Sequence, residues 1–350
     1  MFRPPFRRGA LVATLLLVLA SAGVAAAPAG AANSPVTLRL GYFPNVTHAP
    51  ALVGVGANLF GQKLGPNVDL QLRTFNSGTE ELQAFQAGAL DAGYIGPSPT
   101  ITAWTQLHRG VRVVSGAASG GAYFVVQPSI NSAADLKGKA VASPQLGNTQ
   151  DVALRVWLKS KGLSTDATGG GDVHVVPQDN ATTLNAFKAG QIAGAWVPEP
   201  WATRLINEGG GKILVNESKL WPGGRFVTTQ LVVTTAFLKA HRDVVKRLVA
   251  AQVAANDYIR TNQADAESLV AKGIQQITGK AIAPSLVSES FTHIEFTDDP
   301  VASSLVKNNR DLKSLGLPSA RSLKGVYDLS FLNAALKSAK EPTVRVPSGL

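Results

Sequence analysis

An internal repeat constrains the fold of this chain more than any other feature. The segment LQAFQAGALDAGYIGPSP, which starts at Leu82, recurs as LNAFKAGQIAGAWVPEP, which starts at Leu184, with one residue deleted. In each copy a helical pattern ends at a glycine, a short apolar strand follows, and two prolines close the unit. A period of about one hundred residues is too long for a solenoid repeat. The repeat therefore predicts two similar lobes.

Strands and helices alternate along the chain. The segments VTLRLGY from Val36 and VDLQLRTF from Val68 have the alternating pattern of strands, and helical patterns follow from Ala49 and from about Thr79. This alternation predicts an α/β fold with largely parallel sheets. In such sheets the loops at the carboxyl ends of the strands form the ligand site. Candidate ligand contacts are therefore sought in those loops.

The first residues read as a targeting segment. Arg3, Arg7 and Arg8 precede an uncharged run that is followed by small residues, so we predict a secretory signal peptide over residues 1–32. The run is too short to span a bilayer comfortably. We expect an exported, soluble protein, in the periplasm or at the outer face of the cytoplasmic membrane. Arg7 and Arg8 also permit a twin-arginine signal, although the Gly9-Ala10 that follows favours general secretion.

Composition excludes several kinds of function. The chain has no cysteine, which rules out disulfides, thiol catalysis and a lipid anchor on an N-terminal cysteine. Loss of three arginines with the signal peptide changes the formal charge from +10 to +7, which favours an anionic partner. No basic run with interleaved aromatic residues is present, so we expect no nucleic-acid binding. No metal-ligand spacing or paired nucleophile and base is visible either. We therefore expect a protein that is not an enzyme and has neither metal nor cofactor. We also expect a monomer.

Three segments together resemble a known family. They are GTEELQAFQAGALDAGYIGPSPTI, ADLKGKAVA and AFKAGQIAGAWVPEPWATRL. In order and spacing they are similar to the substrate-binding proteins of nitrate, taurine and aliphatic sulfonate ABC importers, within the type II periplasmic-binding fold. The resemblance implies a small anionic ligand and a membrane permease as partner. It also implies two lobes that close over the ligand, lobe one being 36–122 with 228–345 and lobe two 123–227.

A second resemblance leaves the ligand open. The segment YFPNVTHAPAL is similar to the start of thiamine-pyrimidine precursor binders and of their pyrimidine synthase relatives, and His48 matches the histidine of those synthases. The synthases also use a cysteine-rich iron site, which a chain without cysteine cannot supply. A heteroaromatic pyrimidine is therefore the alternative ligand, whereas a synthase-like enzyme is disfavoured.

Four loops are predicted to line the ligand cleft. Each runs from a strand into a helix, where unpaired backbone N–H groups and the helix dipole can hold an anion without a full counter-charge. The candidate residues, loop by loop, are Asn45 and His48; Asn76, Ser77 and Gly78; Gly96, Pro97 and Ser98; and Gly147, Asn148 and Thr149.

The second copy of the repeat adds WVPEPW to these candidates. Trp201 can cover the organic part of a ligand, and Glu199 can pair with an amine, which would favour an amino sulfonate such as taurine. Trp196 is predicted to be a core residue, as the counterpart of Tyr94 in the first copy. Arg225 is the alternative anion-binding group, through its guanidinium fork.

Overall fold

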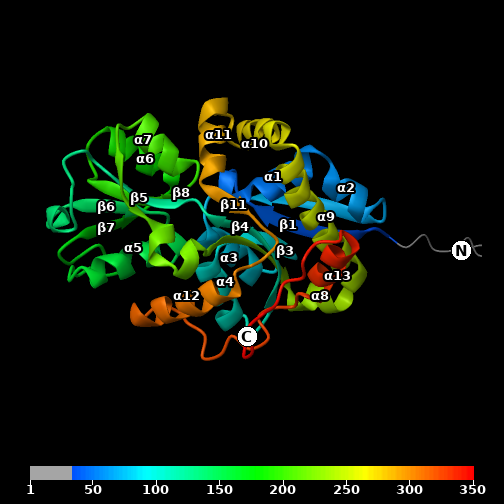
Figure 1. Cartoon of the computed structure of the whole chain (residues 1–350). Helices are drawn as coiled ribbons and strands as arrows, with labels where there is room; N and C mark the ends of the chain where they lie inside the picture. Colours follow the sequence, from blue (N-terminus) through cyan, green and yellow to red (C-terminus); the bar gives the residue numbers. More distant parts are fainter. Residues whose placement is uncertain (1–33) are drawn as a thin grey trace, which may run out of the picture. The chain divides into compact units, whose positions relative to one another are not determined.

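Two sheets organise the chain. The computed structural model describes residues 34–350, and the predicted signal peptide lies outside the described residues. Pro35–Leu350 form one compact unit. Within it, strands on either side of Gly121 belong to different sheets, so the chain passes from one sheet to the other there and returns before Val227 (Figure 1).

The first sheet has six strands among the described residues, in the order β11-β4-β10-β3-β1-β2. They are β1 (Val36–Tyr42), β2 (Val68–Thr74), β3 (Ala92–Ile95), β4 (Val111–Gly120), β10 (Val227–Thr234) and β11 (Ile294–Phe296). The second sheet, within the same described range, has the order β7-β6-β8-β5-β9. Its strands are β5 (Ala122–Val126), β6 (Ala140–Ser143), β7 (His174–Pro177), β8 (Gly194–Pro198) and β9 (Lys212–Asn216). We call the two sheets with their helices the six-stranded lobe and the five-stranded lobe.

The sheet order confirms the repeat. Read outward from one edge, β2-β1-β3-β10-β4 in one lobe matches β7-β6-β8-β5-β9 in the other. The repeated strands β3 and β8 hold the same place, and their aromatic residues Tyr94 and Trp196 are fully buried, as predicted. Phe85 and Phe187 of the preceding helices are buried as well. The predicted boundaries, 122/123 and 227/228, fall beside the two crossovers; as domain boundaries they stay a prediction.

The sheets are more mixed than the alternation predicts. Strand β1 is parallel to β2 and β3, and β6 is parallel to β7 and β8. Strand β10, however, runs antiparallel to β3 and β4, and β5 runs antiparallel to β8 and β9. Both β5 and β10 directly follow a crossover, so each enters its sheet without the intervening helix that a parallel connection needs. The expectation of largely parallel sheets is therefore wrong for these strands.

Helices cover both faces of each sheet (Figure 1). Those of the six-stranded lobe are α1 (Ala49–Gly56), α2 (Leu59–Leu64), α3 (Gly78–Gln86), α4 (Pro97–Gln106), α8 (Thr235–Ala240), α9 (Arg242–Thr261), α10 (Gln263–Thr278), α11 (Pro284–Thr292), α12 (Ala302–Ser314) and α13 (Ser330–Ser338). Those of the five-stranded lobe are α5 (Thr149–Ser160), α6 (Asn180–Lys188) and α7 (Trp201–Asn207). Short 3-10 turns occur at η1 (Val46–His48), η2 (Ala134–Leu136), η3 (Glu217–Leu220) and η4 (Pro222–Gly224).

Side-chain caps fix the starts of several helices that follow strands, among them α3, α5 and α6. Ser77 accepts the backbone N–H of Glu80 at the start of α3, and Asp179 accepts that of Thr182 at the start of α6. At the start of α5, the side chain of Asn148 accepts the backbone N–H of the next residue, Thr149. Such caps satisfy otherwise unpaired N–H groups and set where the strand-to-helix loops end.

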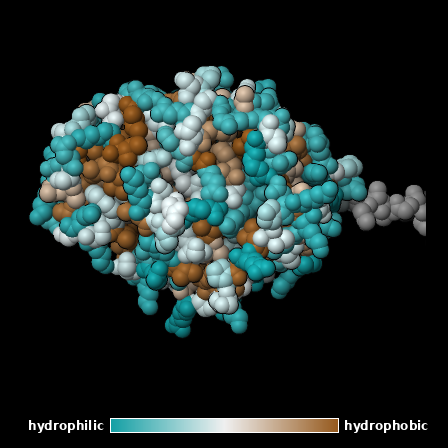
Figure 2. Space-filling model, in the orientation of Figure 1, coloured by the Kyte–Doolittle hydropathy of each residue, from teal (hydrophilic) through white to brown (hydrophobic). Residues whose placement is uncertain are grey.

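Hydrophilic residues cover most of the face shown in Figure 2, and apolar residues show through in separate patches. Among the described helices, none combines the length and the apolar character needed to cross a bilayer.

Candidate functional site

A small cavity lies where the carboxyl ends of the parallel strands of both lobes meet. Its volume is about 20 Å3, room for about one water molecule. The six-stranded lobe contributes residues after β1, β2 and β3 and on β10, and the five-stranded lobe contributes residues after β6 and β7 and at the end of β8. We call it the inner cavity. It is lined by Phe43, Asn45, Thr47, His48, Asn76, Gly96, Pro144, Asn148, Thr149, Gln150, Asn180, Pro198, Thr228 and Thr229.

Neutral polar groups dominate the inner cavity. The side-chain oxygens of Thr149, Thr229 and Asn180 are buried and have no hydrogen-bond partner among the described residues. Buried polar atoms are nearly always paired, so three orphans in one cavity are polar groups available to a ligand or to water. Among residues 34–350, no lysine, arginine, aspartate or glutamate lines this cavity. Any anion held here is therefore held without a full counter-charge.

His48 is a neutral hydrogen-bond donor in this cavity. Burial lowers its pKa to about 3, so the imidazole is uncharged at neutral pH. The backbone N–H of Phe43 donates to its Nδ1 at 3.3 Å, which places the proton of the neutral ring on Nε2. The Phe43 ring stacks on the imidazole, with centroids 4.2 Å apart. His48 can thus donate one hydrogen bond to a ligand.

The two opposing helix starts are not equivalent. At α5, Thr149 and Gln150 both line the cavity, and the helix dipole adds positive potential there. At α4, prolines occupy the first and third positions, so the first turn offers only the N–H of Ser98. The predicted cradle of N–H groups is also reduced at α5, because the N–H of Thr149 donates to Asn148 Oδ1 and that of Gly147 to Asp151 Oδ2. Gly96 approaches it closely, since a Cβ at Gly96 would lie 2.4 Å from Thr149 Oγ1.

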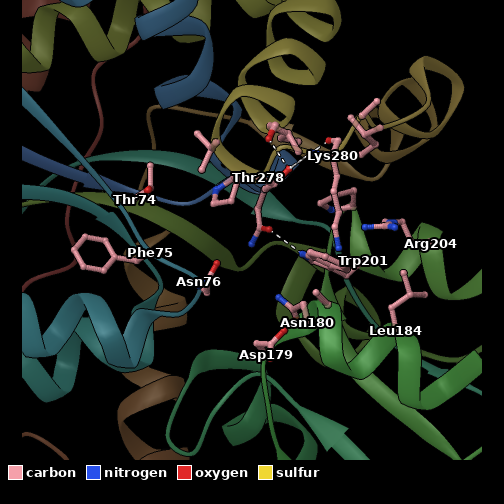
Figure 3. A pocket seen from close by; sticks show the side chains of 18 of the residues that line it. Thr74, Phe75, Asn76, Asp179, Asn180, Leu184, Trp201, Arg204, Thr278 and Lys280 are labelled. Carbon is pink, nitrogen blue, oxygen red and sulfur yellow. Dashed lines mark hydrogen bonds between the residues drawn. The ribbon is translucent and has the colours of Figure 1, made fainter.

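A larger outer chamber adjoins the inner cavity and shares Asn45, Asn76 and Asn180 with it. Its volume is about 470 Å3, within the range of small-molecule sites. Trp201 lies at its centre and donates its indole N–H to Asn45 Oδ1 at 2.9 Å, across the two lobes (Figure 3). Lys280, from the six-stranded lobe, points toward the same ring (Figure 3).

Direct hydrogen bonds join the lobes beside the inner cavity. Ser77 Oγ donates to Gln145 Oε1 at 2.7 Å, and Gln145 Nε2 donates to Glu80 Oε1 at 2.9 Å. Thr79 Oγ1 donates to the carbonyl of Leu146 at 3.3 Å. The lobes are therefore closed on each other in this structure. An anion larger than a water molecule needs them to move apart, which is feasible because the cavity walls come from both lobes.

Glu199 makes a different link between the lobes. Its carboxylate is fully buried, accepts the N–H and hydroxyl of Thr203, and contacts Ser290 Oγ at 3.3 Å and His293 Nδ1 at 2.7 Å. The hydrogen bond to Glu199 raises the pKa of His293. Both oxygens are thus engaged by the protein, and Glu199 lines neither the inner cavity nor the outer chamber.

The structure brings seven of the predicted site residues to the two spaces. Asn45, His48, Asn76, Gly96, Asn148 and Thr149 line the inner cavity, and Trp201 lines the outer chamber. The other six residues line neither space, and each lies within two positions of a lining residue in the sequence: Ser77, Gly78, Pro97, Ser98, Gly147 and Glu199. Arg225, the alternative anion-binding group, lies in neither space and pairs with Glu295 at 2.9 Å and Asp299 at 3.4 Å. Ligand contact by any of these residues stays a prediction.

Among the lining residues of the inner cavity that sequence reasoning missed are Asn180 and Thr229, whose buried side-chain oxygens have no partner among the described residues. Asn180 starts α6 directly after β7, so the strand-end rule that selected Asn148 could have selected it too. Thr229 lies inside the buried strand β10, where the sequence VTTQLVVT gives no sign that one hydroxyl faces a cavity. Within the described residues, no group of three or more histidine, aspartate or glutamate side chains could hold a metal ion.

Two matched α/β lobes with a cleft at the carboxyl ends of their strands define the type II periplasmic-binding-protein fold. A solved structure with this fold is the alkanesulfonate-binding protein SsuA from Xanthomonas axonopodis pv. citri bound to MOPS. It superposes with a TM-score of 0.70 at 21% identity, over 85% of this chain and 99% of that one.

Family membership rests on the sequence match. Residues 31–275 match the NMT1-like family, and the chain belongs to it. An inferred binding protein of Brucella abortus (strain 2308) is 28% identical over 324 residues, which are 88% of this chain and 94% of the relative. The taurine-binding periplasmic protein of Escherichia coli (strain K12) is 29% identical over 198 residues, 56% of this chain and 59% of the relative.

Proposed function

We propose that this chain is the extracytoplasmic solute-binding protein of an ABC importer, which captures a small anion between its lobes and presents it to a membrane permease. The observation that carries the proposal is the inner cavity, where unpartnered buried hydroxyls from both lobes meet the start of α5 and where no ionised side chain among the described residues belongs to the lining. The lobes are 36–122 with 228–345, and 123–227. The protein binds the anion and turns nothing over.

Hydrogen-bond chemistry supports an anion over a cation. The inner cavity offers the Nε2–H of His48, the hydroxyls of Thr149 and Thr229, and the amino end of α5, all of which can donate. No carboxylate among the described residues lines it to attract a cation. The relatives named for taurine and alkanesulfonate binding agree with this chemistry, so sulfonates, taurine and nitrate are the ligands to test first.

Isosteric threonine variants test the proposal. Thr149→Val and Thr229→Val each remove one hydroxyl from the inner cavity, and loss of a hydrogen bond to a charged ligand weakens binding by about 1.5 to 3 kcal/mol, roughly tenfold to a hundredfold. Thr183→Val is the matched control, because the Thr183 hydroxyl is also buried and unpartnered within residues 34–350 but lines neither space.

Calorimetric titration with a panel of sulfonates, taurine, nitrate and a pyrimidine precursor measures these affinities, and mass spectrometry of ligand released on denaturation identifies what the protein carries. Binding of a pyrimidine in place of every anion would overturn the proposal. Chemical conversion of the ligand during incubation would overturn the binding-only role.

A further inference from the structure

The size and lining of the outer chamber indicate which kind of group follows the anionic head of the ligand. Much of its lining is apolar and comes from both lobes. The larger apolar residues among them are Phe75, Leu184, Trp201, Ile274, Ile277 and Ile282. A volume of about 470 Å3 far exceeds what nitrate or the two-carbon chain of taurine fills. The chamber therefore fits an organic body that can lie on the Trp201 ring.

Among the described residues, three charged side chains line the outer chamber, and two of them already have partners within the protein. The Cζ atom of Arg204 lies 4.8 Å from the centroid of the Trp201 ring, and Arg204 Nε pairs with Glu208 Oε1 at 2.6 Å. Asp179 is occupied as the cap of α6, where it accepts both the N–H and the hydroxyl of Thr182. A carboxylate at a helix start is also stabilised by the helix dipole.

Lys280 is the exception. Within residues 34–350, no carboxylate lies within 4 Å of its ammonium group, although its side chain points toward Trp201 (Figure 3). An unpaired cation beside an apolar surface attracts a negative group and repels a positive one. Glu199, the carboxylate that the sequence suggested as a partner for an amine, is buried and accepts hydrogen bonds from Thr203 and His293 instead.

We propose that the ligand is an extended organic anion: its anionic head enters the inner cavity, its apolar body lies on Trp201, and its far end carries a second negative group beside Lys280. This inference rests on the proposed function, because it takes the anionic head from there. It separates this chain from a taurine binder, since the two-carbon chain of taurine would leave most of the outer chamber and Lys280 without a ligand group.

Three ligands of equal length test the charge at the far end. Hexanesulfonate, 6-sulfohexanoate and 6-aminohexanesulfonate share the head and the chain and end in a methyl, carboxylate or ammonium group. We expect the carboxylate to bind best and the ammonium worst, with steps of about two- to fivefold at low salt, as for solvent-exposed ion pairs, since Lys280 is exposed. In Lys280→Gln these steps should collapse to less than about 1.5-fold, whereas Lys272→Gln, an exposed lysine of α10 outside the chamber, should keep them.

The results distinguish the two proposals. Equal affinity of the wild type for the three ligands, or preference for the ammonium or for taurine, overturns the extended-anion inference and leaves the anion-binding function standing. Failure of every sulfonate and of nitrate to bind overturns the proposed function itself. An unchanged charge preference in Lys280→Gln also contradicts the inference, because another residue would then set it.

Discussion

Replacing Glu217 by glutamine should change how the stability of the protein depends on pH. Glu217 is 1% exposed, and its oxygens accept the indole N–H groups of Trp196 at 2.7 Å and Trp221 at 3.3 Å. Burial raises its pKa from 4.5 to about 7, since the two indole hydrogen bonds offset only part of the desolvation. The folded state therefore holds a proton that the unfolded state releases between pH 4.5 and 7.

The sign and size follow from linkage. Because the folded protein binds more protons in this window, the free energy of unfolding falls as pH rises, by about 3 kcal/mol for a shift of this size. Glutamine cannot ionise. The difference in stability between Glu217→Gln and the wild type should therefore grow in favour of the variant by about 3 kcal/mol from pH 4.5 to 8.

Urea denaturation followed by tryptophan fluorescence at pH 4.5, 6, 7 and 8 measures this. With a slope of about 3 kcal/mol per molar urea, the midpoint difference should change by about 1 M. Glu208→Gln is the control that should stay nearly constant over this range, since the hydrogen bond from Arg204 lowers the pKa of Glu208 and its pH dependence therefore falls at and below pH 4.5. A Glu217→Gln difference that stays constant within about 0.5 kcal/mol over this range would refute the reasoning.

Three further outcomes test the closed arrangement of the lobes. Gly96→Ala should fold normally, because Gly96 has φ −73°. The added Cβ would lie 2.4 Å from Thr149 Oγ1, so the lobes could not close fully and calorimetry should show anion affinity lower by about tenfold or more. An unchanged affinity would contradict the closed geometry. His293→Gln should lower stability by about 1 kcal/mol below pH 6.5, because Glu199 raises the pKa of His293. This loss should shrink as pH rises through the folded-state pKa; thermal melts that show a pH-independent loss would argue against the charge pair. Small-angle scattering of the wild type should give a smaller radius of gyration with saturating ligand than without, and equal radii would exclude a hinge closure.

Much of the fold was predictable because local signals agreed with the tertiary packing. The glycine-ended helices and the buried strands with Tyr94 and Trp196 were visible as a repeat, and both strands occupy matching places in their sheets. Strand β4 gave no such signal. Its sequence VRVVSGAASG lacks alternation, because nearly the whole strand is buried and small residues there accommodate neighbouring backbone: a Cβ on Gly116 would lie 2.4 Å from the carbonyl oxygen of Asp299.

The candidate site was predictable only where strand ends meet helix starts. That rule led to Asn148 and Thr149, which line the inner cavity. It could not lead to Lys280, which lies in the loop between α10 and α11 and reaches the chamber only through the packing of distant segments. Nor could it show that Glu199 is engaged by His293, since nothing local to either residue indicates that they meet.

The two crossovers also determine when each sheet can be completed during synthesis. All strands of the five-stranded sheet lie between residues 122 and 216, so this sheet can form as soon as that stretch has emerged. The six-stranded sheet cannot, because β10 inserts between β3 and β4 and is made more than one hundred residues after them. Until then the facing edges of β3 and β4 lack a partner, and unpaired edges invite pairing with other chains. The newly made protein therefore passes through a stage in which its first half depends on being kept apart from its neighbours, although the finished fold buries both edges.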